Sequence, residues 1–156
     1  MRDFKLTADG DIDFSTGDIQ FTSGNELKIQ RIMTVLGTTK GEWKYDEDEG
    51  INTRAILTKN PNESEIIDNI RDGLLQVDEN LVITSYTFEV IERRLYLKLY
   101  ISGGENEEYS FVMGTLPNSS TPIVASLDAD TALRAGNALE ALTICAATIG
   151  IYKAEI

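Results

Sequence analysis

The sequence of 156 residues contains no histidine, a single cysteine, three prolines and one tryptophan. Without histidine, the chain has neither a Ser-His-Asp or Cys-His catalytic arrangement nor a histidine-ligated zinc site. The single cysteine, Cys145, excludes an internal disulfide framework and a zinc site made of several cysteines. Cationic side chains are also scarce, because 14 Lys and Arg stand against 26 Asp and Glu and leave a formal net charge of −12. We therefore expect no nucleic-acid partner, since affinity for a phosphate backbone comes mainly from Lys and Arg.

Long apolar runs are absent as well. The amino-terminal residues become polar within a few positions, which is unlike a signal peptide. The longest apolar neighbourhood, residues 139–152, is interrupted by Glu140 and is shorter than the ~20 residues of a membrane-spanning helix. We therefore expect no membrane association and a protein that folds in the cytoplasm.

The first 23 residues have the pattern of short strands and tight turns. Polar and apolar residues alternate in Asp11–Phe14 and in Asp18–Phe21, which predicts a half-buried hairpin. Asp9, Asp11 and Asp13 also resemble the start of a calcium-binding loop. Phe14 stands where that loop needs glycine and Gln20 where it needs a bidentate glutamate, so solvated turn carboxylates are favoured over a metal site.

Two amphipathic helices are predicted next. The first begins at Gly24-Asn25 and ends at Gly37, with an apolar stripe at i, i+3, i+4 and i+7 formed by Ile29, Ile32, Met33 and Leu36. An irregular stretch, residues 38–59, follows. The second helix has Asn62 as its N-cap and Glu65 three residues later, and its apolar face contains Ile66, Ile67, Ile70, Leu74 and Val77.

Alternating segments then predict three antiparallel strands. Their apolar positions are Val82, Tyr86, Phe88 and Val90, then Leu95, Leu97, Leu99 and Ile101, then Tyr109, Phe111 and Met113. The fold class expected is α+β: an antiparallel meander sheet with two amphipathic helices packed on one face, plus an Ala-rich C-terminal helical extension.

The chain is predicted to divide into a domain at residues 1–115, a linker at 116–122 and an extension at 123–156. The linker contains two of the three prolines. Residues 1–115 have 22 acidic and 12 basic residues, whereas the remainder has 4 and 2 and is rich in alanine and glycine. A helix is expected from about 128 to 147, packed on its own domain or against another subunit.

Catalysis would have to depend on carboxylates. Glycosidases use one protonated and one ionised carboxyl group, and this chain offers Glu42 beside Trp43, the run Asp46–Glu49, and Glu63 with Glu65. None of these can be singled out as a pair, and adjacent like charges favour an exposed loop over a pocket. Cys145 has no activating base and is expected to be a small buried residue. We therefore expect no catalytic residue, no cofactor and no metal.

The order of motifs resembles the gene-25-like (GPW) family of phage tail baseplate proteins, which includes wedge and sheath-initiator components. The resemblance covers residues 10–101 and depends on Gln30–Ile32 in the first helix, the element Leu36–Glu42, and the spacing to Ile66, Ile70 and Leu74. Family members often have Glu-Pro-Arg after the second helix, where this chain has Asp78-Glu79-Asn80.

The resemblance implies a structural component of a phage or phage-like tail baseplate, at the wedge or sheath-initiator position, that acts by protein–protein assembly. Its partners would be other baseplate, hub or sheath proteins; it would be oligomeric within the assembly and a monomer or small oligomer alone. It would reside in the virion tail, and in the host cytoplasm during assembly. Two alternatives are a cytoplasmic, anti-adaptor-like regulatory module of the same fold and an acidic, carboxylate-dependent, lysozyme-like hydrolase.

An interaction surface is predicted in the irregular stretch. Trp43 is either partly buried core or an anchor for a partner. An exposed sheet edge beside the last strands is also expected to accept a strand from a neighbour. The residues predicted to form the interaction surface are Glu42, Trp43, Asp46, Glu47, Asp48 and Glu49.

Overall fold

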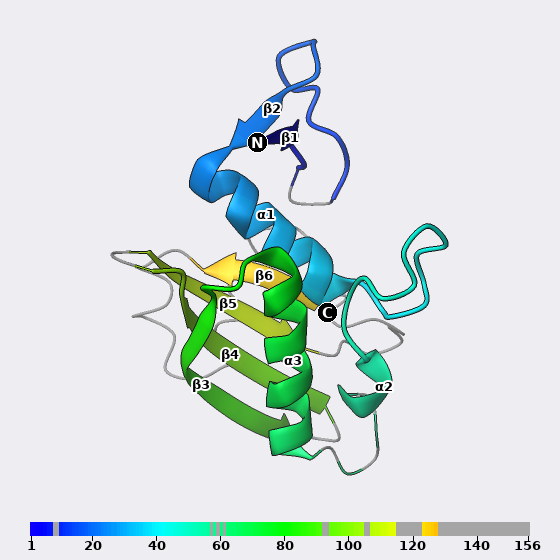
Figure 1. Ribbon diagram of the computed structural model, residues 1–156, viewed down its shortest axis with the longest axis vertical. Coiled ribbons are helices and arrows are strands. Elements are labelled where there is room, and N and C mark those ends of the chain that lie inside the picture. Colours follow the sequence, from blue (N-terminus) through cyan, green and yellow to red (C-terminus); the bar gives the residue numbers. More distant parts are fainter. Residues whose placement is uncertain are drawn as a thin grey trace, which may run out of the picture.

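The computed structural model describes residues 1–7, 10–56, 58, 60, 62–91, 94–104, 107–114 and 123–127. Its elements follow the chain in the order β1 (Arg2–Phe4), β2 (Phe21–Ser23), α1 (Gly24–Gly37), α2 (Thr53–Ile56), α3 (Glu63–Val77), β3 (Val82–Ile91), β4 (Arg94–Ser102), β5 (Glu108–Gly114) and β6 (Ile123–Leu127). Figure 1 shows β1 and β2 above one end of α1, apart from the sheet that the four later strands form.

Both long helices begin where their sequences predict, and α1 also ends at the predicted residue. In α1 the last residue is Gly37, and the N–H of Thr38 donates to the carbonyl oxygen of Val35 at 3.3 Å. In α3 the side chain of Asn62 accepts from the N–H of Ser64 at 3.1 Å, which satisfies one free amide of the first turn. Their buried residues lie on one face of each helix and include Ile32, Leu36, Ile66, Ile70 and Leu74.

The larger sheet is antiparallel, with the strand order β3-β4-β5-β6. A β-bulge between Ile83 and Ser85 changes which side chains of β3 face the helices. The prediction that Val82 lies on the apolar face with Phe88 was therefore wrong: Val82 is 57% exposed, and Ile83 packs against the core instead.

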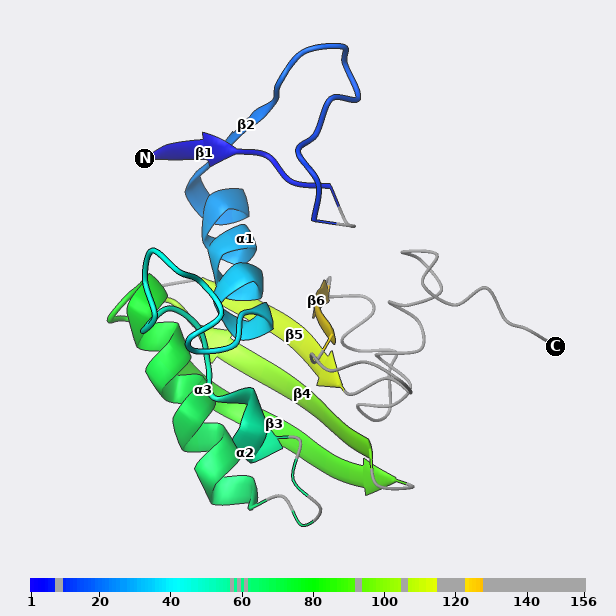
Figure 2. The ribbon, with the colours of Figure 1, turned by 90° about the vertical axis from the view of Figure 1, so that its right-hand side faces the viewer.

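Both long helices cover one face of this sheet, so the predicted α+β architecture is confirmed. Figure 2 shows α1 and α3 on the same side, with α1 contacting β6 and α3 contacting β3. The core lies between the layers and joins the helix faces to alternate residues of the strands, among them Leu95, Leu97, Leu99, Ile101, Phe111 and Met113.

The opposite face of the central strands is buried too, which the sequence pattern did not predict. Tyr96, Lys98 and Val112 alternate with the core residues, yet they are only 6%, 4% and 0% exposed. The ammonium group of Lys98 lies 5.2 Å from the centroid of the Tyr100 ring, a cation–π arrangement that favours burial of the charge.

The fourth strand, β6, pairs with β5 from Ser110↔Leu127 to Gly114↔Ile123. The sheet therefore continues into the segment predicted to be an extension, where no strand was expected at residues 123–127. The linker at 116–122, the helix at 128–147 and Cys145 lie outside the described residues. The division of the chain at residue 115 remains a prediction.

The hairpin predicted at Asp11–Phe14 and Asp18–Phe21 was wrong. The amino-terminal strand β1 pairs with β2 instead, and the rings of Phe4 and Phe21 lie 5.4 Å apart. Residues 11–14 form only an isolated bridge between Leu6 and Ile12 and a few single hydrogen bonds. Four residues of alternating pattern do not specify the strand with which they pair. In this chain the amino-terminal strand β1 pairs with β2 in place of residues 11–14.

Candidate interaction surface

The segment between α1 and α2 closes on itself at its base. The N–H of Ile51 donates to the carbonyl oxygen of Thr38 at 2.9 Å, and the N–H of Lys40 donates to the carbonyl oxygen of Ile51 at 2.9 Å. Ile51 is fully buried and lies against Gly73 of α3, where an added Cβ would come within 2.5 Å of its Cγ2 atom. The base of the loop is therefore part of the core.

Two side-chain amides of α3 hold the same segment. Gln76 accepts from the N–H of Gly50 at 2.9 Å and donates to its carbonyl oxygen at 3.0 Å. Asn69 lies about two turns before Gln76 on the same face of α3. It makes the same pair of bonds with the backbone of Asn52, at 3.0 and 2.8 Å. Each amide reproduces the two bonds that a neighbouring strand would give, so an irregular backbone is fixed without a sheet.

Gly50 is required where it stands. Its φ is +99°, and an added Cβ would lie 2.4 Å from the carbonyl oxygen of Thr38. Only glycine adopts such a φ without strain and leaves room for this approach.

The residues beyond this base, Gly41–Glu49, form what we call the 41–49 loop, and it is ordered by its own hydrogen bonds. The carboxylate of Glu42 accepts from the N–H of Thr39 at 3.1 Å. The N–H of Gly41 donates to the carbonyl oxygen of Glu47 at 2.9 Å, and the N–H of Asp46 donates to that of Trp43 at 3.1 Å. The loop therefore has a defined conformation, with both ends attached to the helical layer.

The 41–49 loop displays two aromatic rings. Trp43 is 50% exposed and Tyr45 is 86% exposed, and their rings meet edge to face with centroids 6.3 Å apart. Trp43 lies outside the core, so the interpretation of it as core was wrong. The structure brings all six predicted interaction residues together in this loop, and their role in binding remains a prediction. Tyr45 was not predicted as part of this surface, although a second aromatic residue two positions after Trp43 could have indicated it.

A second apolar surface lies on the amino-terminal side of α1. Gln30 donates to the carbonyl oxygen of Phe4 and accepts from the N–H of Leu6, both at 2.9 Å, and so ties β1 to the helix. A groove between these elements is lined by the apolar residues Phe4, Leu6 and Ile12 and also by Arg31 and Glu49. Gln30 was singled out in the sequence only as part of a motif; its contacts give it a structural role.

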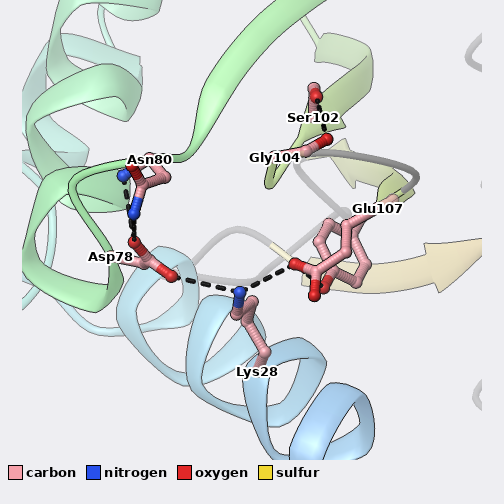
Figure 3. A network of polar contacts seen from close by, with 7 residues as sticks. Lys28, Asp78, Asn80, Ser102, Gly104 and Glu107 are labelled. Carbon is pink, nitrogen blue, oxygen red and sulfur yellow. Dashed lines mark hydrogen bonds and ion pairs between the residues drawn. The ribbon is translucent and has the colours of Figure 1, made fainter.

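One ion network joins three segments that are distant in sequence. Figure 3 shows the ammonium group of Lys28 between Asp78 and Glu107, at 3.1 and 2.8 Å from their carboxylate oxygens. Lys28 belongs to α1, Asp78 follows α3, and Glu107 precedes β5. Asp78 thus has an ionic role in this fold.

These contacts shift the pKa values of the groups concerned. The pKa of Lys28 is raised, mainly by its hydrogen bond to Glu107 and then by that to Asp78. The pKa of Asp78 is held at about 2, first by the backbone N–H of Asn80 and then by Lys28. The pKa of Glu107 is lowered, mainly by Lys28 and then by the hydroxyl of Tyr109. A general acid needs a raised carboxyl pKa, so neither carboxylate has the shift for that task.

The described residues contain no group of three or more carboxylate or cysteine side chains placed to hold a metal ion. Within the same residues, no helix is long and apolar enough to cross a membrane.

One end of the larger sheet is formed by β3. Among the described strands, β3 has a neighbour on one side only. Its ten residues include one charge, Glu89, and neither lysine nor proline, which are the residues that commonly protect an edge from pairing. Val82, Tyr86, Val90 and Ile91 on this strand are each more than 40% exposed.

Comparisons with known proteins agree with this architecture. The family of contractile injection system sheath initiators matches residues 2–105. A crystal structure from Geobacter sulfurreducens, of a protein described as a candidate tail lysozyme, superposes with a TM-score of 0.51. It is 20% identical, and the alignment covers 64% of this chain and 96% of that one, so the likeness is one of fold. No curated protein matches the chain.

Proposed function

The chain belongs to the family of contractile injection system sheath initiators, and from that premise we propose that it is a non-catalytic baseplate component at the wedge or sheath-initiator position. Membership of this family makes it a structural component of a tail that interacts with other tail or sheath components. Its finer role is to bind baseplate, hub or sheath proteins, after synthesis in the host cytoplasm.

The observation that carries this proposal is the edge of β3, which has no strand partner on its outer side among the described residues. The bulge near Ile83 interrupts the first part of this edge, but the part beyond it, residues 86–91, is regular. It has a single charge and three exposed apolar or aromatic side chains, Tyr86, Val90 and Ile91, and such an edge is a template for another chain. In strand addition, main-chain hydrogen bonds provide affinity and alternate side chains provide specificity. We propose that β3 accepts an extended arm from a neighbouring tail protein, and that the net charge of −12 disfavours edge-to-edge pairing of free copies.

The exposed features of the 41–49 loop favour assembly over hydrolysis. The loop displays two aromatic rings and several carboxylates on a fixed backbone, which suits contact with another protein. The fold shared with the Geobacter sulfurreducens protein does not transfer an activity, since one fold supports many functions.

A lysine on the edge strand tests the proposal. Val90→Lys places a charge at a side chain that is 48% exposed, so the isolated protein should fold normally. Leu75→Lys is the matched control, because Leu75 is a similarly exposed aliphatic residue (52%) on α3 rather than on the edge. We expect the Val90 variant to be lost from purified tails, and the Leu75 variant to be incorporated like the unmodified chain.

Normal incorporation of Val90→Lys would contradict strand addition at β3. A separate assay addresses catalysis: the purified chain is incubated with peptidoglycan, and no soluble fragments are expected. Release that disappears in Glu42→Gln would replace the structural proposal with the hydrolase alternative.

A further inference from the structure

We propose that the 41–49 loop is a second docking element, and that it binds a positively charged protein surface with an apolar recess for Trp43 and Tyr45. This inference rests on the proposed function, because it names the chemistry of one partner in the tail. It concerns a different surface from β3: in Figure 1 the loop projects past the carboxyl end of α1, while β3 lies on the far side of α3.

The aromatic pair supplies the apolar part of the contact. Trp and Tyr are the residues most often found to dominate binding energy at protein interfaces, and they do so when they fill a recess and exclude water. In this chain Trp43 and Tyr45 are exposed and their rings lie edge to face. No fold-stabilising role requires them to be exposed, whereas a docking role does.

The charge around the pair determines the kind of partner. The 41–49 loop has one lysine against five carboxylates, which leaves a formal charge of −4. Glu42, Asp46, Glu47 and Asp48 are all exposed. Such a surface repels phosphate backbones, anionic lipids and other copies of this chain, and it attracts a surface rich in Lys and Arg.

The loop is also organised before binding. The bonds from Gln76 to Gly50 and the hydrogen bonds within the loop fix the backbone that carries both rings. A partner therefore loses little affinity to ordering of this segment, which is the usual cost of binding through a loop.

Photo-crosslinking in assembled tails identifies the partner surface. Benzoylphenylalanine replaces Tyr45 in one full-length chain and Val90 in another, in cells that produce the tail. Cross-links from position 45 should fall on a tail protein, at a patch with an excess of Lys and Arg. Cross-links to an acidic or neutral patch, to a second copy of this chain or to lipid, or no cross-link in tails that contain the chain, would overturn the inference.

Position 90 separates this inference from the proposed function. Cross-links from 90 with none from 45 would leave strand addition intact and remove the docking loop. Cross-links from 45 to a basic patch with none from 90 would do the reverse. Absence of the unmodified chain from purified tails would remove the proposed function itself.

Variants of the 41–49 loop measure how much its charges and its rings contribute to incorporation into tails. Asp46→Asn, Glu47→Gln and Asp48→Asn together should slow incorporation into tails by about tenfold at low salt, with the difference shrinking as salt rises. The matched control removes three exposed charges elsewhere, Glu65→Gln, Asp72→Asn and Glu79→Gln, and should have little effect.

The double variant Trp43→Ala, Tyr45→Ala should weaken incorporation by about 30-fold or more, because it removes both anchors. Phe14→Ala, a 57% exposed aromatic residue outside the loop, is its control. Equal effects of the loop variants and their controls would contradict the inference, provided that circular dichroism shows each variant to be folded.

Discussion

Replacing Gln76 with alanine tests whether α3 fixes the 41–49 loop. The side chain of Gln76 makes two hydrogen bonds with the backbone of Gly50, at 2.9 and 3.0 Å, and Gly50 is buried. Alanine keeps the helix, since it is the best helix former. The substitution removes the hydrogen-bond partners of the N–H and of the carbonyl oxygen of Gly50, two groups that water does not readily reach. The variant therefore isolates the contribution of this one amide.

The expected loss follows from those two bonds. A hydrogen bond within a protein contributes about 1 kcal/mol net, and more is lost where the remaining group stays buried and unpaired. We expect Gln76→Ala to lower the free energy of unfolding by about 2 kcal/mol, which corresponds to a fall in Tm of about 4–8 °C for a chain of this size. Asn69→Ala removes an equivalent pair of bonds to Asn52, which is exposed. Water replaces these bonds, so a loss of about 0.5–1 kcal/mol is expected.

Urea unfolding of both variants measures the two losses, and hydrogen exchange followed by mass spectrometry locates them. Exchange in Gln76→Ala should accelerate first across residues 41–50, before the strands of the sheet are affected. A loss below about 0.5 kcal/mol for Gln76→Ala, or a larger loss for Asn69→Ala, would refute the view that a buried amide clamp orders the loop.

The remaining predictions concern a glycine and an ion network. Gly50→Ala combines a φ of +99° with a contact of 2.4 Å to the carbonyl oxygen of Thr38; it should cost about 3 kcal/mol or more in urea unfolding, and a neutral result would contradict the close approach. Lys28→Met should raise the pKa of Glu107 more than that of Asp78, measured by carboxyl-detected NMR, because Asn80 contributes first to the low pKa of Asp78. A carboxyl group whose pKa is lower in the folded chain than in the unfolded chain stabilises the fold at pH values above its unfolded pKa. That stabilisation is lost as the pH falls through the folded pKa. Because Lys28→Met removes part of the lowering, this variant should lose less stability than the wild type between about pH 4 and pH 2.

The main elements of the fold were predictable because their signals are long and periodic. The apolar stripes of α1 and α3 extend over several turns, and Gly37 and Asn62 mark ends that the structure retains. The face of β3 was misjudged at Val82, because a single bulged residue reverses the alternation and leaves no compositional trace. The partner of β2 was missed for a similar reason, since a strand of three residues is too short for its period to be read.

The exposure of the 41–49 loop was predictable, but the contacts that hold the loop in place were not. Tryptophan within an acidic, irregular stretch pointed to the 41–49 loop. Nothing local to that stretch indicated that Gln76, more than 25 residues away, holds it through Gly50. Such amide clamps depend on the packing of α3 against the base of the loop, which is a property of the folded chain.

Cryo-electron microscopy of intact tails provides the strictest test of strand addition at β3. We expect to find this chain at the base of the sheath, with an extended segment of a neighbouring tail protein paired along β3. Absence of the chain from the tail would rule out the baseplate role, and its presence with the β3 edge facing solvent would rule out strand addition.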